Sequence, residues 1–274
     1  MQLVDSHGHL QTRPFAEDAA AVLADARAAG LVRLLAPGFD LPTSHAGIAF
    51  ARANPGVDTS VGVHPHVAAE VDDAAWQGLV ALAADPTVVA IGETGLDYDR
   101  GFSPRAAQLD NLRRHVELAW ERRLPLILHC RSKAGERDAQ DELLRELASA
   151  GVGETTWRER FGDRPPAVLH SFSGPVDYAE RALAMGCAVS FSGLVFRKGE
   201  EPSAEVAALV PDDRLLTETD SPYLSPPGAP RRRNEPRWVA ITARWLAERR
   251  GVDPEALGGA LVRAYDRFTE RPTV

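Results

Sequence analysis

The stretch Val88-Val89-Ala90-Ile91-Gly92-Glu93 is a short apolar run that ends in a titratable side chain. Short apolar, β-branched runs between turn signals are typical of buried strands. The pattern recurs, and strands are predicted at residues 3–4, 31–36, 59–63, 88–92, 125–128, 167–169, 187–191 and 215–217. Helix-length spacers separate these runs, which indicates repeated βα units and a parallel sheet. We therefore expect an α/β fold, a TIM-type (β/α)8 barrel, in which residues 1–274 form one domain.

Several spacers carry an apolar stripe at helical spacing, which predicts helices on the outside of the barrel. These helices are expected at residues 105–123, 138–150 and 236–250. Ser103 and Pro104 are expected to supply the N-cap and the first helical position of the first of them. Residues 193–203 and 221–235, rich in Pro, Gly, Ser and Arg, follow late strands and are interpreted as active-site loops.

Composition excludes several classes of protein. The chain has no run of 18 apolar residues and no signal-peptide pattern at its N-terminus, so no membrane span is expected. Two distant cysteines, Cys130 and Cys187, favour a reducing cytoplasm over a disulfide framework. The formal net charge of -8 argues against nucleic-acid binding by bulk charge, although bound cations could reverse the field inside a site.

Titratable residues gather at the ends of the predicted strands. In a closed parallel barrel all the carboxyl ends open on one face, so residues far apart in the sequence would meet there. The side chains at these positions are His7, His9, His64, His66, Glu93, His129, His170 and Asp220. Any one of them alone has an ordinary explanation, such as a hydrogen-bonded core histidine or an Asx turn at Asp220. Their common position favours a shared site.

The donor set suits divalent metal ions, because imidazole and carboxylate are standard ligands for borderline and hard cations. Six ligands are about twice what one ion needs, so we expect two divalent ions, with Mg, Mn, Zn or Ni all compatible. Glu93 is the candidate for a carboxylate that bridges the two ions. One ion is assigned to His7, His9, Glu93 and Asp220, and the other to Glu93, His129 and His170.

The remaining histidines are interpreted differently. His64, in Gly62-Val63-His64-Pro65-His66, is expected either to contact the substrate or its phosphate near the metals or to stabilise a tight turn. His66 is expected to be structural. His45 and His115 are expected to be ordinary surface residues.

Seven motifs resemble the TatD family of metal-dependent deoxyribonucleases and follow the family's order over roughly residues 3–270. They are Val4-Asp5-Ser6-His7-Gly8-His9-Leu10, Gly62-Val63-His64-Pro65, Ile91-Gly92-Glu93-Thr94-Gly95-Leu96-Asp97-Tyr98, Leu128-His129-Cys130-Arg131, His170-Ser171-Phe172-Ser173-Gly174, Glu218-Thr219-Asp220-Ser221-Pro222-Tyr223 and Arg233-Asn234-Glu235-Pro236. The resemblance implies a TIM-type barrel of the metallo-dependent hydrolase-like (amidohydrolase-like) class, with two divalent metals. It also implies an enzyme that hydrolyses phosphodiester bonds of DNA from the 3′ end. It also places Asp220 beside the bridging water and His64 near the substrate. The chain departs from the family at Thr94, at Ser171 and in a longer segment between His129 and His170.

The expected mechanism uses a metal-activated water. Two cations would lower the pKa of a shared water, and the resulting hydroxide would attack phosphorus. Asp220 would take or orient the proton of that water, so Asp220, Glu93 and His64 are the expected catalytic residues.

Cations and aromatic residues near the strand ends are candidates for substrate contacts. Arg131, Arg197 and Lys198 are expected to reach phosphate, or else to be solvated surface charges. The basic run at residues 231–233 could hold a nucleic-acid backbone. Phe172 and Tyr223 are expected either to stack on bases or to pack in the interior.

Two rival functions fit parts of the pattern. Another barrel hydrolase, such as a lactonase, amidase or phosphotriesterase, would use similar ligands, but many of these carry a modified lysine where Glu93 stands. A noncatalytic binding barrel would not need so complete a ligand set. We expect a cytoplasmic monomer with DNA as substrate and no obligatory protein partner.

Overall fold

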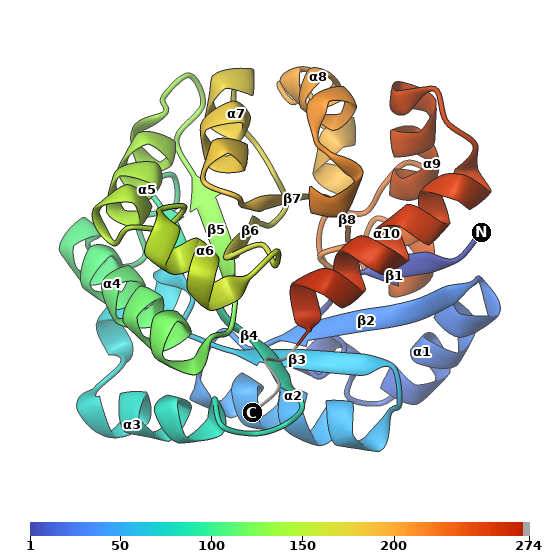
Figure 1. Cartoon of the computed structure of the whole chain (residues 1–274). Helices are drawn as coiled ribbons and strands as arrows, with labels where there is room; N and C mark the ends of the chain where they lie inside the picture. The colour runs from blue at the N-terminus through green and yellow to red at the C-terminus, as the bar shows by residue number, and fades with distance from the viewer. Residues whose placement is uncertain (271–274) are drawn as a thin grey trace.

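The computed structural model describes residues 1–270, and eight parallel strands form its centre (Figure 1). They are β1 (Leu3–Asp5), β2 (Leu31–Pro37), β3 (Val57–Val61), β4 (Val88–Asp97), β5 (Leu126–Arg131), β6 (Ala167–Leu169), β7 (Ala188–Phe191) and β8 (Leu215–Thr217). Each strand pairs with the next in chain order. The backbone N–H of Ser6 donates to the carbonyl of Thr217 at 2.9 Å, and Asp220 donates to His7 at 2.8 Å. These bonds join the last strand to the first, and the predicted barrel is confirmed.

Helices surround the strands as a ring (Figure 1). They are α1 (Ala19–Ala28), α2 (Leu41–Ala53), α3 (Asp73–Leu82), α4 (Arg105–Arg122), α5 (Asp138–Ser149), α6 (Thr155–Phe161), α7 (Val176–Ala184), α8 (Pro202–Leu209), α9 (Val239–Arg250) and α10 (Pro254–Thr269). Short 3-10 turns are η1 (Arg13–Phe15), η2 (Pro65–Glu70), η3 (Gly193–Phe196), η4 (Asp212–Arg214) and η5 (Pro236–Trp238). The apolar faces of the helices pack on the barrel, so the hydrophobic core runs continuously between strands and helices.

The strands β4 and β5 continue well past their predicted ends, and this changes the position of two site residues. β4 continues to Asp97 and β5 to Arg131, so Glu93 and His129 lie within strands and not beyond their ends. The pairing of β4 with β5 shifts register between Ile91 and Thr94, which is the point where Glu93 lies. A local irregularity of this kind re-aims a side chain without ending the strand.

The predicted helix start at residue 105 is confirmed, but the predicted cap is wrong. Pro104 adopts extended backbone angles at the cap position, and α4 begins at Arg105. The Ser103 hydroxyl does not cap the helix, because it donates to the carbonyl of His66 and accepts from the N–H of Ala69. The predicted helix at residues 236–250 begins as the 3-10 turn η5.

The surface assignment of His115 was wrong. This residue lies on the inner face of α4 and is fully buried. Its Nδ1–H donates to the carbonyl of Asn111 at 2.7 Å, and its Nε2 accepts from the N–H of Val63 at 3.0 Å. Both ring nitrogens therefore have hydrogen-bond partners, which allows this polar side chain to be buried. His45 is exposed on α2, as expected.

The segment between His129 and His170, predicted to be longer than in the family, contains both α5 and α6 on the outside of the barrel (Figure 1). Residues 218–235 connect β8 to η5 without a helix or strand, in agreement with the predicted loop at 221–235. The predicted loop at 193–203 is less irregular, because it contains η3 and the first turn of α8.

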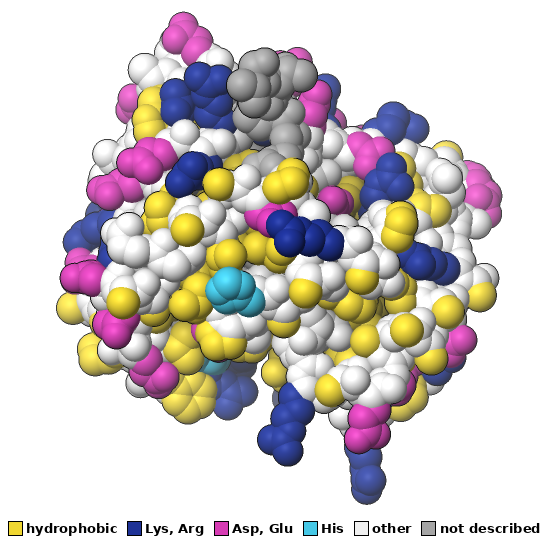
Figure 2. Space-filling view, turned by 90° about the horizontal axis from the view of Figure 1, so that it is seen from below, with side chains coloured by type: hydrophobic (Ala, Val, Ile, Leu, Met, Phe, Trp, Pro, Cys, Tyr) yellow, Lys and Arg dark blue, Asp and Glu magenta, His cyan; other side chains and the backbone are white. Residues whose placement is uncertain are grey.

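Acidic and basic side chains are interspersed on the face that Figure 2 shows, which is the face seen from below Figure 1. That face has no continuous basic band, in keeping with the net charge of -8. Among the described helices, none combines the length and the apolarity that a membrane crossing requires.

Candidate active site

The Glu93 carboxylate lies at the centre of a group of imidazoles. Its Oε1 is 2.9 Å from Nε2 of His170 and 3.2 Å from the nearest ring nitrogen of both His64 and His129. Its Oε2 is 3.2 Å from Nε2 of His7. The side chain is only 4% exposed. Glu93 therefore presents one oxygen to each of two sets of nitrogen donors.

Asp220 completes the set on the Oε2 side. Its Oδ1 is 3.5 Å from Nε2 of His9 and 3.9 Å from Nε2 of His7. The backbone of Asp220 has a positive φ of 54°, and its N–H donates to the carbonyl of His7. This bond fixes the loop after β8 against the segment after β1. His170 stacks on His7 with ring centroids 3.9 Å apart, so His170 borders both sets.

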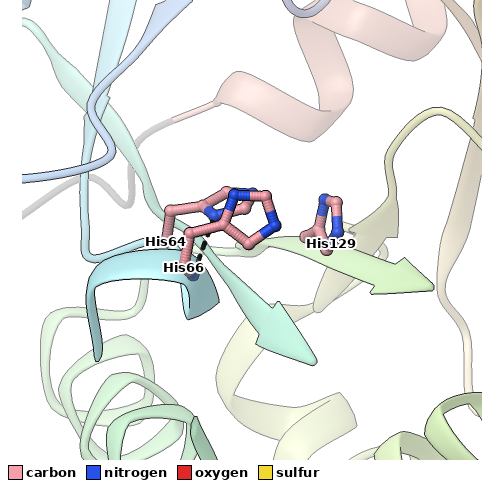
Figure 3. A group of neighbouring side chains, drawn as sticks. All are labelled: His64, His66 and His129. Atoms are coloured by element: carbon pink, nitrogen blue, oxygen red, sulfur yellow. Dashed lines mark hydrogen bonds between the residues drawn. The ribbon is translucent and has the colours of Figure 1, made fainter. Parts of the chain in front are cut away.

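A second group lies on the Oε1 side, where His129 on β5 faces His64 and His66 (Figure 3). The Asp97 carboxylate joins this group, because its Oδ2 accepts from Nε2 of His66 at 2.7 Å and from Nε2 of His129 at 3.1 Å. The other oxygen of Asp97 accepts two backbone N–H groups, from Asp99 and Arg100. His66 thus belongs to the candidate site, which goes beyond the structural role expected for it.

Two further carboxylates, those of Glu218 and Asp5, form hydrogen bonds with residues of the site. Oε1 of Glu218 is 3.1 Å from Nδ1 of His170. Asp5 accepts from the N–H of Thr219 at 2.8 Å and from its hydroxyl at 2.6 Å, which ties β1 to the residue before Asp220. Sequence reasoning missed Asp5, Asp97 and Glu218 as functional residues. The available signal was their position, because each lies within two to four residues of a predicted ligand in the same motif.

Mutual electrostatics set the charge of the central residues. Burial alone would raise the pKa of Glu93, but His170, His64 and His7 hold that pKa well below its usual range. Burial, reinforced by His170, lowers the pKa of His7. Burial also lowers the pKa of His64, to about 4. Glu93 is therefore ionised, and two of the imidazoles that face it, those of His7 and His64, resist protonation.

Neighbouring carboxylates raise the pKa values of the other two histidines around Glu93, His129 and His170. Burial opposes protonation of His129, yet its hydrogen bonds to Asp97 and Glu93 raise its pKa. The pKa of His170 is raised well above its usual value because Glu93 and Glu218 outweigh burial. His9 and His7 hold the pKa of Asp220 below its usual value against burial. Ionised carboxylates and imidazoles thus face one another across the whole site.

The donor set fits divalent cations. His7 is fully buried, and neither of its ring nitrogens has a hydrogen-bond partner within residues 1–270, although Nε2 faces two carboxylates. A buried polar atom without a partner is costly unless something binds it. Three sets have donor atoms close enough to hold an ion: His7, His9 and Asp220; His7, Glu93 and His170; and His64, His66 and His129. Nitrogen and carboxylate donors of this kind suit zinc, manganese or nickel.

Of the cations predicted to contact the substrate, some are already paired with carboxylates and others are not. Arg131 is half exposed, and its Nε lies 2.9 Å from the Asp99 carboxylate. Arg197 and Lys198 are exposed, and no ion pair involves them in the part of the chain that the structure describes. Arg233, at the end of the basic run at 231–233, is already paired with Asp18 and Glu235.

Of the two aromatic candidates, only one is available to a ligand. Phe172 is buried, with its ring stacked on Tyr178, so the stacking role considered for it is excluded. Tyr223 is 61% exposed, and its ring lies edge-on to His9.

Comparison with known proteins identifies relatives over nearly the whole chain. The family described as TatD related DNase matches residues 4–269. A relative from Cronobacter sakazakii, named 3′-5′ ssDNA/RNA exonuclease TatD, is 39% identical over 90% of this chain and 89% of its own. A Bacillus subtilis relative, the uncharacterized metal-dependent hydrolase YabD, is 34% identical over 90% of each chain.

Solved structures agree with this assignment. The TatD homologue YJJV from Escherichia coli superimposes with a TM-score of 0.84 at 25% identity, over 98% of each chain. A lactonase from Listeria monocytogenes shares the fold at a TM-score of 0.62 and 12% identity, over 99% of this chain and 95% of its own. The likeness to the lactonase extends to the barrel alone.

Proposed function

Because this chain belongs to the TatD-related DNase family, we propose that it is a metal-dependent exonuclease that removes nucleotides from the 3′ end of single-stranded DNA or RNA. The observation that carries the proposal is the Glu93 carboxylate, which offers one oxygen to His7 and the other to His129 and His170. Supporting it, the relative from Cronobacter sakazakii is named for this activity.

Two divalent cations per chain are proposed as cofactors. His7, His9 and Asp220 would hold one, His129 and His170 would hold the other, and Glu93 would contact both. Bound there, such cations supply an acidified water and neutralise charge on the phosphate oxygens. The histidine and carboxylate donors are compatible with manganese, zinc, nickel or magnesium.

The chain's own residues have distinct tasks in this proposal. Asp220 is ionised and partly accessible, so its free carboxylate oxygen can accept and orient the proton of the attacking water. His64, whose pKa is lowered to about 4, stays neutral near pH 7 and can accept or donate a hydrogen bond beside Glu93. Asp97 and Glu218 orient His129 and His170 from behind.

Phosphate contacts are assigned to exposed cations at the carboxyl ends of the strands. Arg197 and Lys198 follow η3 and have no carboxylate to neutralise them within the described residues. Arg131 would first have to leave Asp99, so its contribution is expected to be smaller. The whole chain, residues 1–274, is proposed to act as a single catalytic domain.

A modified lysine that bridges two metal ions, as in many other barrel hydrolases, is incompatible with this site. The two lysines of the chain, Lys133 and Lys198, are both exposed, whereas Glu93 is buried. A modified lysine therefore has no place between the two sets of ligands, and the carboxylate of Glu93 occupies that place.

The experiment uses purified protein, manganese or zinc, and single-stranded oligonucleotides labelled at either end. Wild-type protein should shorten a 5′-labelled strand in single-nucleotide steps, which identifies cleavage from the 3′ end. Glu93→Gln and Asp220→Ala should each lower turnover at least about a hundredfold, while circular dichroism shows a retained fold. Wild-type turnover by Asp220→Ala, or hydrolysis of lactones but not of DNA or RNA, would contradict the proposal.

A further inference from the structure

Two aromatic side chains stand exposed at the rim of the candidate site. Phe102 is 68% exposed and Tyr223 is 61% exposed. Among large hydrophobic residues in the described part of the chain, the remaining exposed one is Val252, which is 42% exposed in the turn between α9 and α10. Single exposed apolar side chains are common on protein surfaces, so the case for a binding role rests on where these two rings lie.

Phe102 is held beside the histidines of the Oε1 side. Its ring lies edge-on to that of His66, with centroids 4.8 Å apart, and the rings of His66 and His64 are 4.2 Å apart. The next residue, Ser103, donates its hydroxyl to the carbonyl of His66 at 2.9 Å and accepts from the N–H of Ala69. These bonds pin the loop after β4 to η2, so Phe102 is exposed at a fixed position.

Tyr223 is held beside the ligands of the Oε2 side. Its ring lies edge-on to that of His9 at 6.1 Å, and its N–H donates to the carbonyl of Asp220 at 2.8 Å. The Asp220 carboxylate in turn lies 3.5 Å from Nε2 of His9. The same loop therefore positions a predicted metal ligand and an exposed ring.

The two rings lie at opposite ends of one continuous row of contacts. The row runs from Phe102 through the histidines of one side to Glu93, and from Glu93 through those of the other side to Tyr223. In order, its intermediate members are His66, His64, Glu93, His7 and His9. A strand whose phosphate lies over Glu93 would thus have an aromatic ring ahead of the reacting bond and another behind it.

We propose that Phe102 and Tyr223 form two stacking platforms for unpaired nucleobases on either side of the bond that is cleaved. This inference rests on the proposed nuclease function and adds the two residues that would hold the bases of the strand. Every base has a π-face, so such platforms bind single strands with little preference for sequence. Bases within a duplex are stacked on their neighbours, and both platforms would stay empty.

Binding is the direct test, with the manganese-loaded protein and a labelled oligothymidylate whose linkages are phosphorothioates that resist hydrolysis. Phe102→Ala and Tyr223→Ala should each raise Kd about tenfold. Neither should change Kd for a strand of the same length and charge that carries abasic sugars in place of thymidines. Phe102→Tyr and Tyr223→Phe keep a ring and should bind as wild type, as should Val252→Ala.

Two results would overturn the proposal. One is wild-type affinity of both alanine variants for the base-bearing strand. The other is an equal loss of affinity for the abasic strand, which would assign the rings a purely structural role. Cleavage of an ordinary strand by the wild-type protein is measured separately, so a protein that binds bases through these rings but cleaves nothing contradicts the nuclease function alone.

Discussion

A single carboxylate, Asp97, accepts hydrogen bonds from two imidazoles of the candidate site. An amide at this position must turn its NH2 group either toward both imidazoles, which share Oδ2, or toward the two backbone N–H groups that share Oδ1, so one pair of donors loses its acceptor. We predict that Asp97→Asn lowers metal affinity about tenfold to a hundredfold, because His129 loses the partner that orients it. Isothermal titration with manganese measures this.

The matched control for Asp97→Asn is Asp99→Asn, which removes a nearby carboxylate that contacts the exposed Arg131. That variant should bind manganese as wild type does. An unchanged affinity in Asp97→Asn, or an equal loss in both variants, would contradict the orienting role.

His115 should make stability depend on pH. Burial lowers its pKa from 6.5 to about 4 in the folded protein. The unfolded chain therefore binds more protons between these pH values, and stability is lost as the pH falls through this window. Between pH 7 and pH 5 this one residue should remove about 2 kcal/mol of unfolding free energy.

Urea denaturation of the wild type and of His115→Gln at both pH values isolates the contribution of His115, because other titrating groups cancel in the difference. The variant should be less stable at pH 7 but should lose about 2 kcal/mol less on acidification. Equal losses in both proteins would show that His115 is already protonated, or that it titrates normally, in the folded state.

At the scale of elements, Arg164 joins the ends of three helices. Its guanidinium donates to the carbonyls of Arg123 after α4, Phe161 in α6 and Glu270 after α10. Carbonyls at helix C-termini carry partial negative charge, so a buried cation there is favourable. We predict that Arg164→Met lowers the unfolding free energy by about 2–4 kcal/mol, whereas Arg145→Met, at an exposed i,i+3 pair, costs under about 0.5 kcal/mol.

Thermal and urea unfolding of both variants decide this prediction. A similar small effect for Arg164→Met and Arg145→Met would show that the three helix ends are held by packing alone.

The sequence predicts which segments form strands, but it does not predict where each strand ends. The eight strands follow from apolar runs, because both faces of a barrel strand are buried and the run is continuous. The extension of β4 to Asp97 could not be predicted, since Gly92, Glu93 and Gly95 interrupt that run in the sequence. Pairing with β5, including the register shift beside Glu93, is what keeps these residues in the strand.

The same limit applies to the site. Ligand candidates were predictable because the carboxyl ends of parallel strands meet at one mouth. The roles of Asp5, Asp97 and Glu218 depend on which nitrogen or N–H each carboxylate reaches, and spacing in the sequence carries no such information. The burial of His115 depends equally on tertiary partners at Asn111 and Val63.

At the scale of the whole molecule, attraction for nucleic acid should come from a few cations and not from net charge. The chain carries a net charge of -8, and the exposed pair Arg197 and Lys198 is the group proposed to contact phosphate. Removing two phosphate contacts should reduce the slope of log KM against log salt by about 1.4 for a single strand. Steady-state kinetics of the double variant Arg197→Gln/Lys198→Gln over a range of salt concentrations measures this, and an unchanged slope would place the contacts elsewhere.

The central claim is that distant imidazoles and carboxylates hold a pair of cations around Glu93. The most direct test counts metal by elemental analysis after incubation with manganese or zinc and removal of free ions. We predict about two ions per wild-type chain and a clear loss of at least one in Glu93→Ala, with the fold retained. Wild-type protein without bound metal, or Glu93→Ala with the same metal content as wild type, would contradict the claim.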